Sequence, residues 1–279
     1  MEAVARHFLA AIVLCLQIGV ASSQSSLLFV IADTGNCELE GTARVAAAIR
    51  RQPDASRGTL IEVGDLAYPT ATRERLLACH EPFWGGFGQR LAVPGNHDWN
   101  DPRAAGFFSL FPEPVPRKVH LSGPWHLLLL DSNLKQEAWD AQLEWLDQAL
   151  AKSRGECLIA AWHHPRWSSG KHGDSVFTKP LWDRLQGKAT FTLHGHDHHF
   201  EALPALDGDG KPSPSGVPSF IVGNGGASLY RAGKHQRSDR GLFGQWGFLR
   251  MELDGLAYRW QEFGDDGKIK DSDHGTCRL

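Results

Sequence analysis

The sequence predicts an α/β fold, a sandwich of mixed β-sheets and helices. Apolar runs of strand length alternate with helical patterns in the first part of the chain. The last part instead carries one strand pattern after another. No repeat or linker divides the sequence, so we expect a single domain at residues 24–279.

The pattern of apolar residues predicts the elements in order. Helices are expected at residues 42–51 and 137–153, and the second helix carries an apolar stripe of Trp139, Leu143, Leu146 and Leu150. Strands are expected at residues 26–33, 59–65, 90–98, 125–132, 157–165, 189–199, 219–226, 247–254 and 256–263. Residues 207–218 are rich in Gly, Pro and Ser, which predicts a surface loop.

Composition and charge narrow the class of protein. Of the 279 residues, 42% are hydrophobic and 22% are charged, as in globular proteins. The formal net charge of -3 gives no sign of nucleic-acid binding. Residues 1–23 contain an apolar run followed by small residues, which predicts a signal peptide. The run is short for a membrane span, although an uncleaved anchor is the alternative.

We therefore expect an exported protein, in the periplasm, the external medium or an organelle lumen, with no stable membrane span after cleavage. Four cysteines follow the signal peptide, and they allow three disulfide pairings. An even number in an exported chain favours disulfides. Cys37 and Cys79 each follow shortly after a motif assigned below to one site, so we favour a bond between them. Cys157 and Cys277 then remain for the second bond.

Polar side chains stand at or just beyond the ends of several predicted buried strands: Asp33, Asp65, Asn96, His163 and His196. In open α/β sheets, ligands bind at the carboxyl ends of the strands. Each residue alone has an ordinary structural explanation. Asp33, for example, precedes Thr-Gly, where an Asp often stabilises a turn. Together, the strands would bring side chains of metal-binding type to one edge, which predicts a metal site.

Two motifs add to this set. The Pro-Gly turn in PGNHDW brings Asn96, His97 and Asp98 together in one loop. In HGHDHH, His196 and His198 are two residues apart, so an extended backbone would project both to the same face.

The neighbouring polar residues are expected to support the site. By the alternation of side chains along a strand, His164 should point away from His163. His194 is interpreted as a neighbouring support, and His199 is expected to face solvent or a supporting partner. Glu201 is a candidate for buttressing these histidines.

The ordered motifs ADTG, GDLAY, PGNHD, WHHP and GHDH resemble those of the calcineurin-like metallophosphoesterases. The tyrosine in GDLAY points to the purple acid phosphatase branch, and the sequence looks closest to its single-domain, tartrate-resistant members. The resemblance covers nearly the whole mature chain. It implies an αββα sandwich of two mixed sheets flanked by helices, with a two-metal site at the carboxyl edge of the strands.

The resemblance also implies which residues bind the metals. Asp65 would bridge the two ions, the first held by Asp33, Tyr68 and His198 and the second by Asn96, His163 and His196. A phenolate and carboxylates favour Fe(III), whereas imidazoles and an amide oxygen suit divalent iron, zinc or manganese. Two such ions clamp a phosphate ester, and a metal-bound hydroxide would attack phosphorus.

Three further residues are candidates for catalysis. His97 is our candidate for protonating or stabilising the leaving group, with Asp98 orienting it. His172 lies in a flexible loop after His163 and is a second candidate for contacting the leaving group. A surface-loop histidine is the alternative interpretation of His172.

The predicted function is hydrolysis of small phosphate monoesters by an exported, acid-phosphatase-like enzyme. A phosphodiesterase acting on nucleotides or phospholipids would use the same metals and is the first alternative. A non-catalytic, metal-stabilised binding scaffold is the second. Such a scaffold is expected to lose ligands or the catalytic histidine, and this sequence keeps them all.

Overall fold

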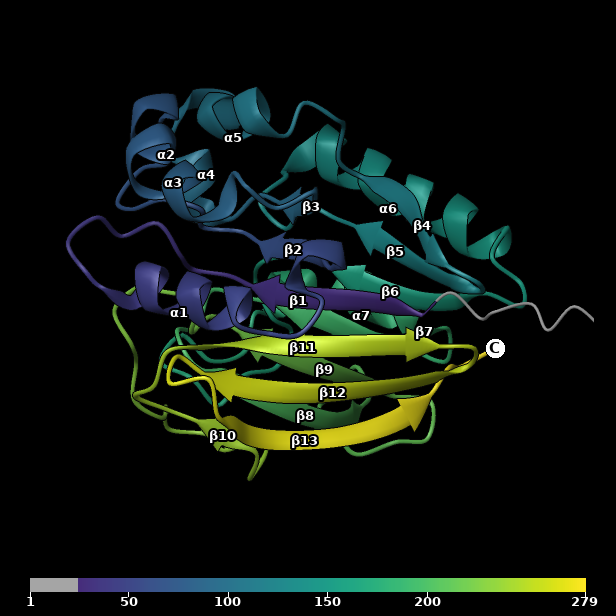
Figure 1. Cartoon of the computed structure of the whole chain (residues 1–279). Helices are drawn as coiled ribbons and strands as arrows, with labels where there is room; N and C mark the ends of the chain where they lie inside the picture. Colours follow the sequence, from purple (N-terminus) through teal and green to yellow (C-terminus); the bar gives the residue numbers. More distant parts are fainter. Residues whose placement is uncertain (1–24) are drawn as a thin grey trace, which may run out of the picture.

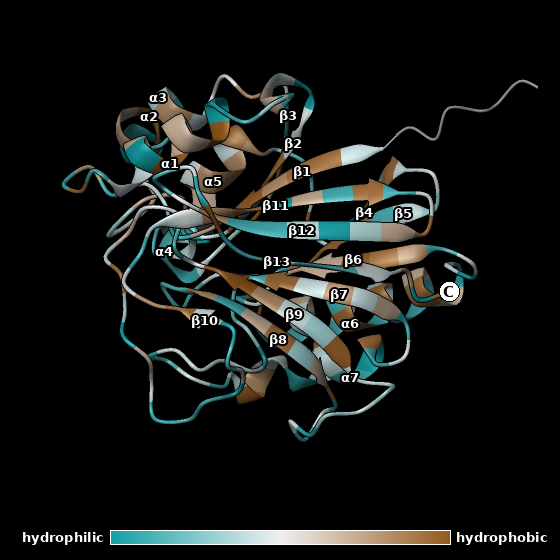
Figure 2. Ribbon diagram, turned by 60° about the horizontal axis from the view of Figure 1, so that its bottom comes forward, coloured by the Kyte–Doolittle hydropathy of each residue, from teal (hydrophilic) through white to brown (hydrophobic). Residues whose placement is uncertain are grey.

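The computed structural model describes residues 25–279, so the predicted signal peptide at residues 1–23 lies outside the described residues. Two β-sheets lie face to face, and helices cover the outer side of each sheet (Figure 1). The apolar residues follow this layering, since much of β1 (Ser26–Ile31) is brown in Figure 2 while the long loops are mostly teal and white.

The first sheet joins the beginning of the chain to its end. Besides β1 it contains β2 (Thr59–Val63), β3 (Gln89–Val93), β11 (Gly247–Asp254), β12 (Ala257–Gly264) and β13 (Ile269–Thr276). The order across the sheet is β13-β12-β11-β1-β2-β3. β1, β2 and β3 are parallel, whereas β11 runs antiparallel to β1, beside which it lies in Figure 1.

The second sheet is built from the middle of the chain. Its strands are β4 (Arg117–Ser122), β5 (Trp125–Leu129), β6 (Cys157–Ala161), β7 (Ala189–His194), β8 (Phe200–Leu206), β9 (Val217–Val222) and β10 (Gly241–Leu242). They follow the order β10-β8-β9-β7-β6-β5-β4. β5, β6, β7 and β9 are parallel, and the outer strands are antiparallel.

The helices are short, apart from α1 and α6. They are α1 (Gly41–Arg50), α2 (Arg73–Cys79), α3 (Glu81–Trp84), α4 (Asn96–Trp99), α5 (Ala105–Leu110), α6 (Gln136–Ala151) and α7 (Lys179–Leu185), with 3₁₀ turns at Ala55–Arg57, Pro102–Ala104 and Val176–Thr178. The stripe predicted on α6 is confirmed. Leu146 and Leu150 are buried, and Trp139 and Leu143 pack against the same cluster.

Side-chain alternation along the strands builds three apolar layers. In β1, Leu28 and Val30 face the space between the sheets, whereas Phe29 and Ile31 pack toward α1. In β6, Ile159 faces inward and Leu158 packs toward the helices on the other side. Both sheets are therefore buried on two faces, and the predicted αββα sandwich is confirmed.

Several predicted strands end earlier in the structure than in the sequence analysis. β6 ends at Ala161 and β7 at His194, so the histidines after them lie in loops rather than in extended strands. The second sheet also contains β4, β8 and β10, and the first contains β13, none of which was predicted.

Both favoured disulfides are present, Cys37–Cys79 and Cys157–Cys277. The first joins the loop after β1 to the end of α2, and the second ties the segment after β13 to β6 in the other sheet. Within residues 25–279, no helix combines the length and the apolar character needed to cross a bilayer.

Candidate metal centre

The candidate ligands lie just past the ends of parallel strands. Asp33, Asp65, His163 and His196 each come two residues after β1, β2, β6 and β7, respectively. Asn96 begins α4, directly after the loop that follows β3. Because the parallel strands point the same way, their loops meet at one edge of the sandwich.

The backbone at this edge is held in an uncommon conformation. Asp33 and Asp65 both have φ of 55°, and His196 has φ of 71°, in the left-handed region that non-glycine residues rarely adopt. Hydrogen bonds fix it, because the backbone N–H of His196 donates to Asp33 Oδ2 at 2.8 Å. Gly95 packs so closely that a Cβ there would lie 2.2 Å from Asp65 Oδ1. Strained residues of this kind concentrate at functional sites.

One group of donor atoms surrounds the Tyr68 hydroxyl. Tyr68 Oη lies 2.8 Å from Asp33 Oδ1 and 3.1 Å from His198 Nε2, and the latter two atoms are 3.3 Å apart. His198 uses its other nitrogen, Nδ1, to contact the carbonyl of Ser228 at 2.6 Å. If Nδ1 donates this hydrogen bond, Nε2 is unprotonated, and its lone pair is available to a metal ion held between His198, Tyr68 and Asp33.

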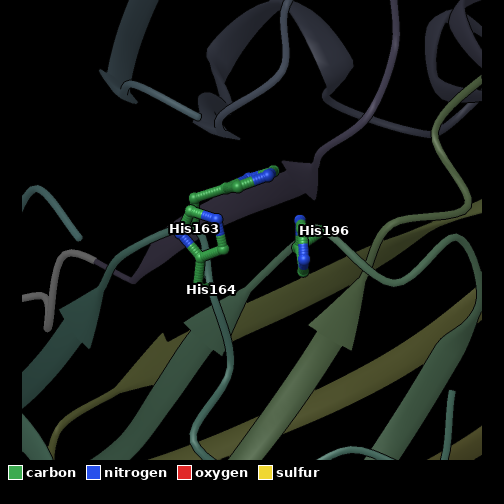
Figure 3. Close-up of side chains that lie close together, drawn as sticks. All are labelled: His163, His164 and His196. Atoms are coloured by element: carbon green, nitrogen blue, oxygen red, sulfur yellow. The ribbon is translucent and has the colours of Figure 1, made fainter. Parts of the chain in front are cut away.

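A second group gathers around His196. Its Nδ1 lies 3.0 Å from Asn96 Oδ1, and its ring centroid is 5.3 Å from that of His163. His163 contacts the carbonyl of Val63 through Nδ1 at 2.8 Å, which leaves Nε2 for the centre. The rings of His163, His164 and His196 converge from the loops after β6 and β7 (Figure 3).

Asp65 connects the two groups. Its Oδ2 lies 3.3 Å from Tyr68 Oη and 3.2 Å from His163 Nε2. Its other oxygen, Oδ1, accepts the backbone N–H of His97 at 2.7 Å. One carboxylate oxygen therefore faces both donor groups.

The donors fit metal ions. His163 Nε2 is fully buried, and although Asp65 Oδ2 lies 3.2 Å away, it makes no well-aligned hydrogen bond among the described residues. Ligands about 2.1 Å from one ion lie about 3 to 3.5 Å from each other, and the spacings within each group are close to this range. The geometry brings all seven predicted ligands together, and their assignment to individual ions stays a prediction.

His164 lies in the centre, contrary to the prediction that it points away. Its ring centroid is 4.4 Å from that of His196, and its Nδ1 contacts the Ser132 hydroxyl at 2.8 Å. The alternation argument fails because β6 has already ended at Ala161. Burial and the neighbouring His163 lower the pKa of His164 to about 3, so it is neutral and able to donate a lone pair.

The electrostatics of the centre involve two groups that hold protons at neutral pH, His163 and Tyr68. Burial lowers the pKa of His163, but the Asp65 carboxylate outweighs burial and raises this pKa to about 10. Burial, with the carboxylates of Asp33 and Asp65, raises the pKa of Tyr68 well above its usual value. His163 and Tyr68 thus hold protons that bound metal ions would displace.

His97 and Asp98 do not form the predicted pair. The His97 ring lies 4.4 Å from the Tyr68 ring and contacts the carbonyl of Pro69 through Nδ1 at 2.6 Å, with Nε2 left over. The buried carboxylate of Asp98 instead accepts backbone N–H groups of Asp65, Leu66 and Gly95 at 2.8, 3.2 and 2.7 Å. Asp98 therefore fixes the loops that carry the ligands and does not orient the imidazole.

His172 borders the centre from a separate loop. Its exposed ring lies 4.4 Å from that of His196, and its backbone N–H donates to Asp197 Oδ1 at 2.8 Å. Tyr230 was missed in the sequence analysis, yet its ring stacks on His198 with centroids 4.0 Å apart. No motif surrounds Tyr230, so only the fold reveals its position.

The remaining polar residues are buried supports. His194 contacts the carbonyl of Trp162 and the Thr192 hydroxyl at 3.0 and 2.9 Å. His199 is fully buried, so of the two expected alternatives the structure supports the supporting partner, which is Glu201 at 3.2 Å, and not solvent. Glu201 also accepts the backbone N–H of Ser169.

An αββα sandwich that gathers two joined groups of metal donors at its strand ends has the architecture of a two-metal phosphoesterase. The family model for calcineurin-like phosphoesterases matches residues 27–200, and the chain belongs to this family. The predicted family is thereby confirmed.

Curated relatives support the predicted branch. The chain is similar to tartrate-resistant acid phosphatase type 5 of Sus scrofa, with 29% identity over 120 residues, and of Homo sapiens, with 31% identity over 125 residues. Each alignment covers 42% of this chain, but only 33% of the pig protein and 34% of the human protein. The chain thus matches about a third of the length of these relatives.

Solved structures share the fold. The purple acid phosphatase PPD1 of yellow lupin (Lupinus luteus) superposes with a TM-score of 0.75 at 17% identity, covering 91% of this chain and 54% of that one. GAP50, the anchor in the inner membrane complex of Plasmodium, gives a TM-score of 0.74 at 14% identity, covering 91% and 90%. At these identities the similarity concerns the fold alone.

Proposed function

We propose that the chain is an exported metal-dependent phosphatase that hydrolyses phosphate monoesters, with residues 24–279 as its catalytic domain. The observation that carries the proposal is the single Asp65 oxygen that faces both donor groups. Family membership and the similarity to acid phosphatases add support. Export is supported by the two disulfides, which are typical of oxidising compartments.

The donor sets suggest which metals are held. Tyr68, Asp33 and Asp65 offer phenolate and carboxylate oxygens, which suit Fe(III). Asn96, His163 and His196 suit a divalent ion such as iron, zinc or manganese. Held by these residues, a pair of ions would supply the positive charge that binds a phosphate ester and the Lewis acidity that lowers the pKa of a water molecule.

The chain's own residues would complete the reaction. His97 has its Nδ1 on the carbonyl of Pro69, so Nε2 is the atom from which a proton can pass to the leaving oxygen. Asp98 holds the backbone of the loops that present Asp65 and Asn96. We assign to His172, whose ring lies beside that of His196, the role of contacting the leaving group.

Rates on two chromogenic esters test the proposal. The metal-loaded protein is expected to hydrolyse para-nitrophenyl phosphate with a higher kcat/KM than bis(para-nitrophenyl) phosphate. The reverse order would make the protein a phosphodiesterase. About two metal ions per chain with no hydrolysis of either ester would point to a metal-stabilised binding scaffold instead.

A further inference from the structure

A cavity of about 660 Å³ opens beside the metal centre, within the size range of small-molecule sites. It lies between two loops, residues 168–174 and residues 229–235. His172 and Tyr230 line this cavity, and they also contact His196 and His198 through their rings. The cavity and the metal centre therefore share a wall.

The cavity is positively charged. Lys171, Arg231 and Lys234 line it, and none of the three forms an ion pair within the described part of the chain. Lys171 places its ammonium 4.6 Å from the centre of the Tyr230 ring. The acidic residue in the lining, Asp174, is already paired with Arg237. The chain as a whole has a formal net charge of -3, so this local group of unpaired positive side chains stands out. Such a group would attract an anionic ligand.

Hydrogen bonds between the two loops hold the cavity in shape. The backbone N–H of Gly233 donates to the carbonyl of Ser169 at 2.7 Å, and that of Arg237, just after the second loop, donates to the Ser169 hydroxyl at 2.6 Å. Ser169 itself is anchored through its N–H to the buried Glu201. The backbone N–H of Tyr230 donates to the carbonyl of His198 at 3.0 Å. This bond joins the second loop to the loop after β7 that carries His196 and His198. The backbone that carries the three positive side chains is therefore held in place by hydrogen bonds.

We propose that this cavity binds a second anionic group of the substrate, while the phosphate to be hydrolysed lies at the metal centre. The preferred substrates are then small organic phosphates with a second phosphoryl group or carboxylate, held by Lys171, Arg231 and Lys234. This inference rests on the proposed phosphatase function and specifies its substrate class.

A matched pair of substrates tests the proposal: fructose 1,6-bisphosphate and fructose 6-phosphate. The wild-type enzyme is expected to prefer the bisphosphate in kcat/KM by about tenfold or more, since three ion pairs add up. The triple variant Lys171→Gln, Arg231→Gln, Lys234→Gln should lose this preference and keep its kcat/KM for the monophosphate within about threefold. The preference should also weaken at high salt.

Lys135→Gln is the matched control. Lys135 is an exposed lysine that lines two other cavities next to His164 and Asn96, and it does not line the basic cavity. It should keep the preference for the bisphosphate. A similar loss in this variant would mean that general positive charge near the centre is responsible, and the proposal would fall. It would also fall if the wild type showed no preference for the bisphosphate.

A binding experiment separates this proposal from the proposed function. Propane-1,3-bisphosphonate and propylphosphonate cannot be hydrolysed, so calorimetry on the metal-loaded protein measures the cavity without catalysis. The bisphosphonate should bind about tenfold more tightly to the wild type and lose that advantage in the triple variant. If neither para-nitrophenyl phosphate nor the sugar phosphates are hydrolysed but this difference is seen, the function proposal fails and the cavity proposal stands. Equal binding of both phosphonates to the wild type overturns the cavity proposal.

Discussion

Tyr68 is the residue that most restricts which metal ions would suit the centre. Its hydroxyl lies among two carboxylates and an imidazole, and burial and the carboxylates raise its pKa well above the usual value. The phenol therefore stays protonated until a strongly charged cation displaces the proton. Among the candidate metals, Fe(III) is the hardest acid and the best partner for a phenolate.

The first prediction concerns colour. The iron-loaded protein should be violet to pink, from charge transfer between the Tyr68 phenolate and Fe(III). Tyr68→Phe should abolish this visible band in an absorption spectrum. Tyr230→Phe is the control, because the Tyr230 ring stacks on His198 and Tyr230 is not one of the seven candidate ligands, so it should keep the band. A band that survives in Tyr68→Phe would remove Tyr68 from the ligand set.

The second prediction concerns His97. His97→Ala should lower kcat on an alkyl phosphate by about 100-fold or more, because general acid catalysis contributes about 10²–10⁴-fold. Metal content and the unfolding midpoint should stay close to those of the wild type, since His97 is partly exposed and bonds through its ring to one carbonyl. The exposed His274→Ala serves as the control and should leave kcat unchanged. A loss of less than tenfold would contradict the acid role.

At the scale of elements, strand ends were the most predictable feature. Apolar runs that end in a polar residue predict from the sequence alone that Asp33, Asp65 and His163 lie at one edge. The exact backbone after each strand was not predictable, because the left-handed turn at His196 depends on contacts with Asp33 from another strand. The same limit explains the wrong orientation predicted for His164.

Other elements lacked a local signal. β13 (IKDSDHGT) is a polar strand at the edge of the sheet. It forms because it pairs with the long strand β12, and its own composition does not indicate a strand. The helices from α2 to α5 have at most seven residues, too few for a helical period to emerge. Tyr230 joins the centre through a loop whose backbone bonds to residues distant in the sequence, His198 and Ser169.

A buried charge cluster connects β2, β3 and α3. His80 Nε2 lies 2.6 Å from Glu62 Oε2, and Arg90 donates to Glu62 at 2.8 Å and to Glu81 at 2.8 Å. Burial lowers the pKa of His80, but the Glu62 carboxylate outweighs it and raises this pKa. The hydrogen bond from His80 is the main reason that the pKa of Glu81 falls to about 2.

The third prediction follows from the sign of these shifts. The contribution of His80 is fully present below pH 6.5 and is lost as the pH rises through its raised pKa. That of Glu81 is present above pH 4.5 and is lost as the pH falls toward about 2. Between these limits both act, so the cluster stabilises the fold in mildly acidic conditions.

Urea unfolding of Glu62→Gln at pH 5.5 and pH 9 measures this effect. The variant should lose about 3–5 kcal/mol at pH 5.5, as expected when one partner of a buried ion pair is removed, and less at pH 9. Glu113→Gln removes an exposed carboxylate near Arg117 and should change the free energy of unfolding by less than about 1 kcal/mol. An equal loss for Glu62→Gln at both pH values would contradict the protonated state of His80.

At the scale of the whole molecule, the first strand and the last three strands belong to the same sheet. β11, β12 and β13 return to the sheet that β1 begins, after the chain has built the entire second sheet. The Cys157–Cys277 bond then joins β6 in the second sheet to the segment after β13 in the first. Cys37–Cys79 acts locally, since it lies at the rim of the loop that carries Tyr68 and Pro69.

The last prediction contrasts these two bonds. The Cys157–Cys277 bond closes a separation of 120 residues and the Cys37–Cys79 bond one of 42 residues, for which chain entropy gives about 5 and about 4 kcal/mol. The double variant Cys157→Ala, Cys277→Ala should therefore show the larger loss in the free energy of unfolding, measured in urea. Cys37→Ala, Cys79→Ala should instead show the larger loss of bound metal, measured on the folded protein without urea, because it loosens the loops around Asp33 and Tyr68. If the metal content followed the Cys157–Cys277 bond instead, the centre would depend on how the two sheets are held together rather than on its own loops.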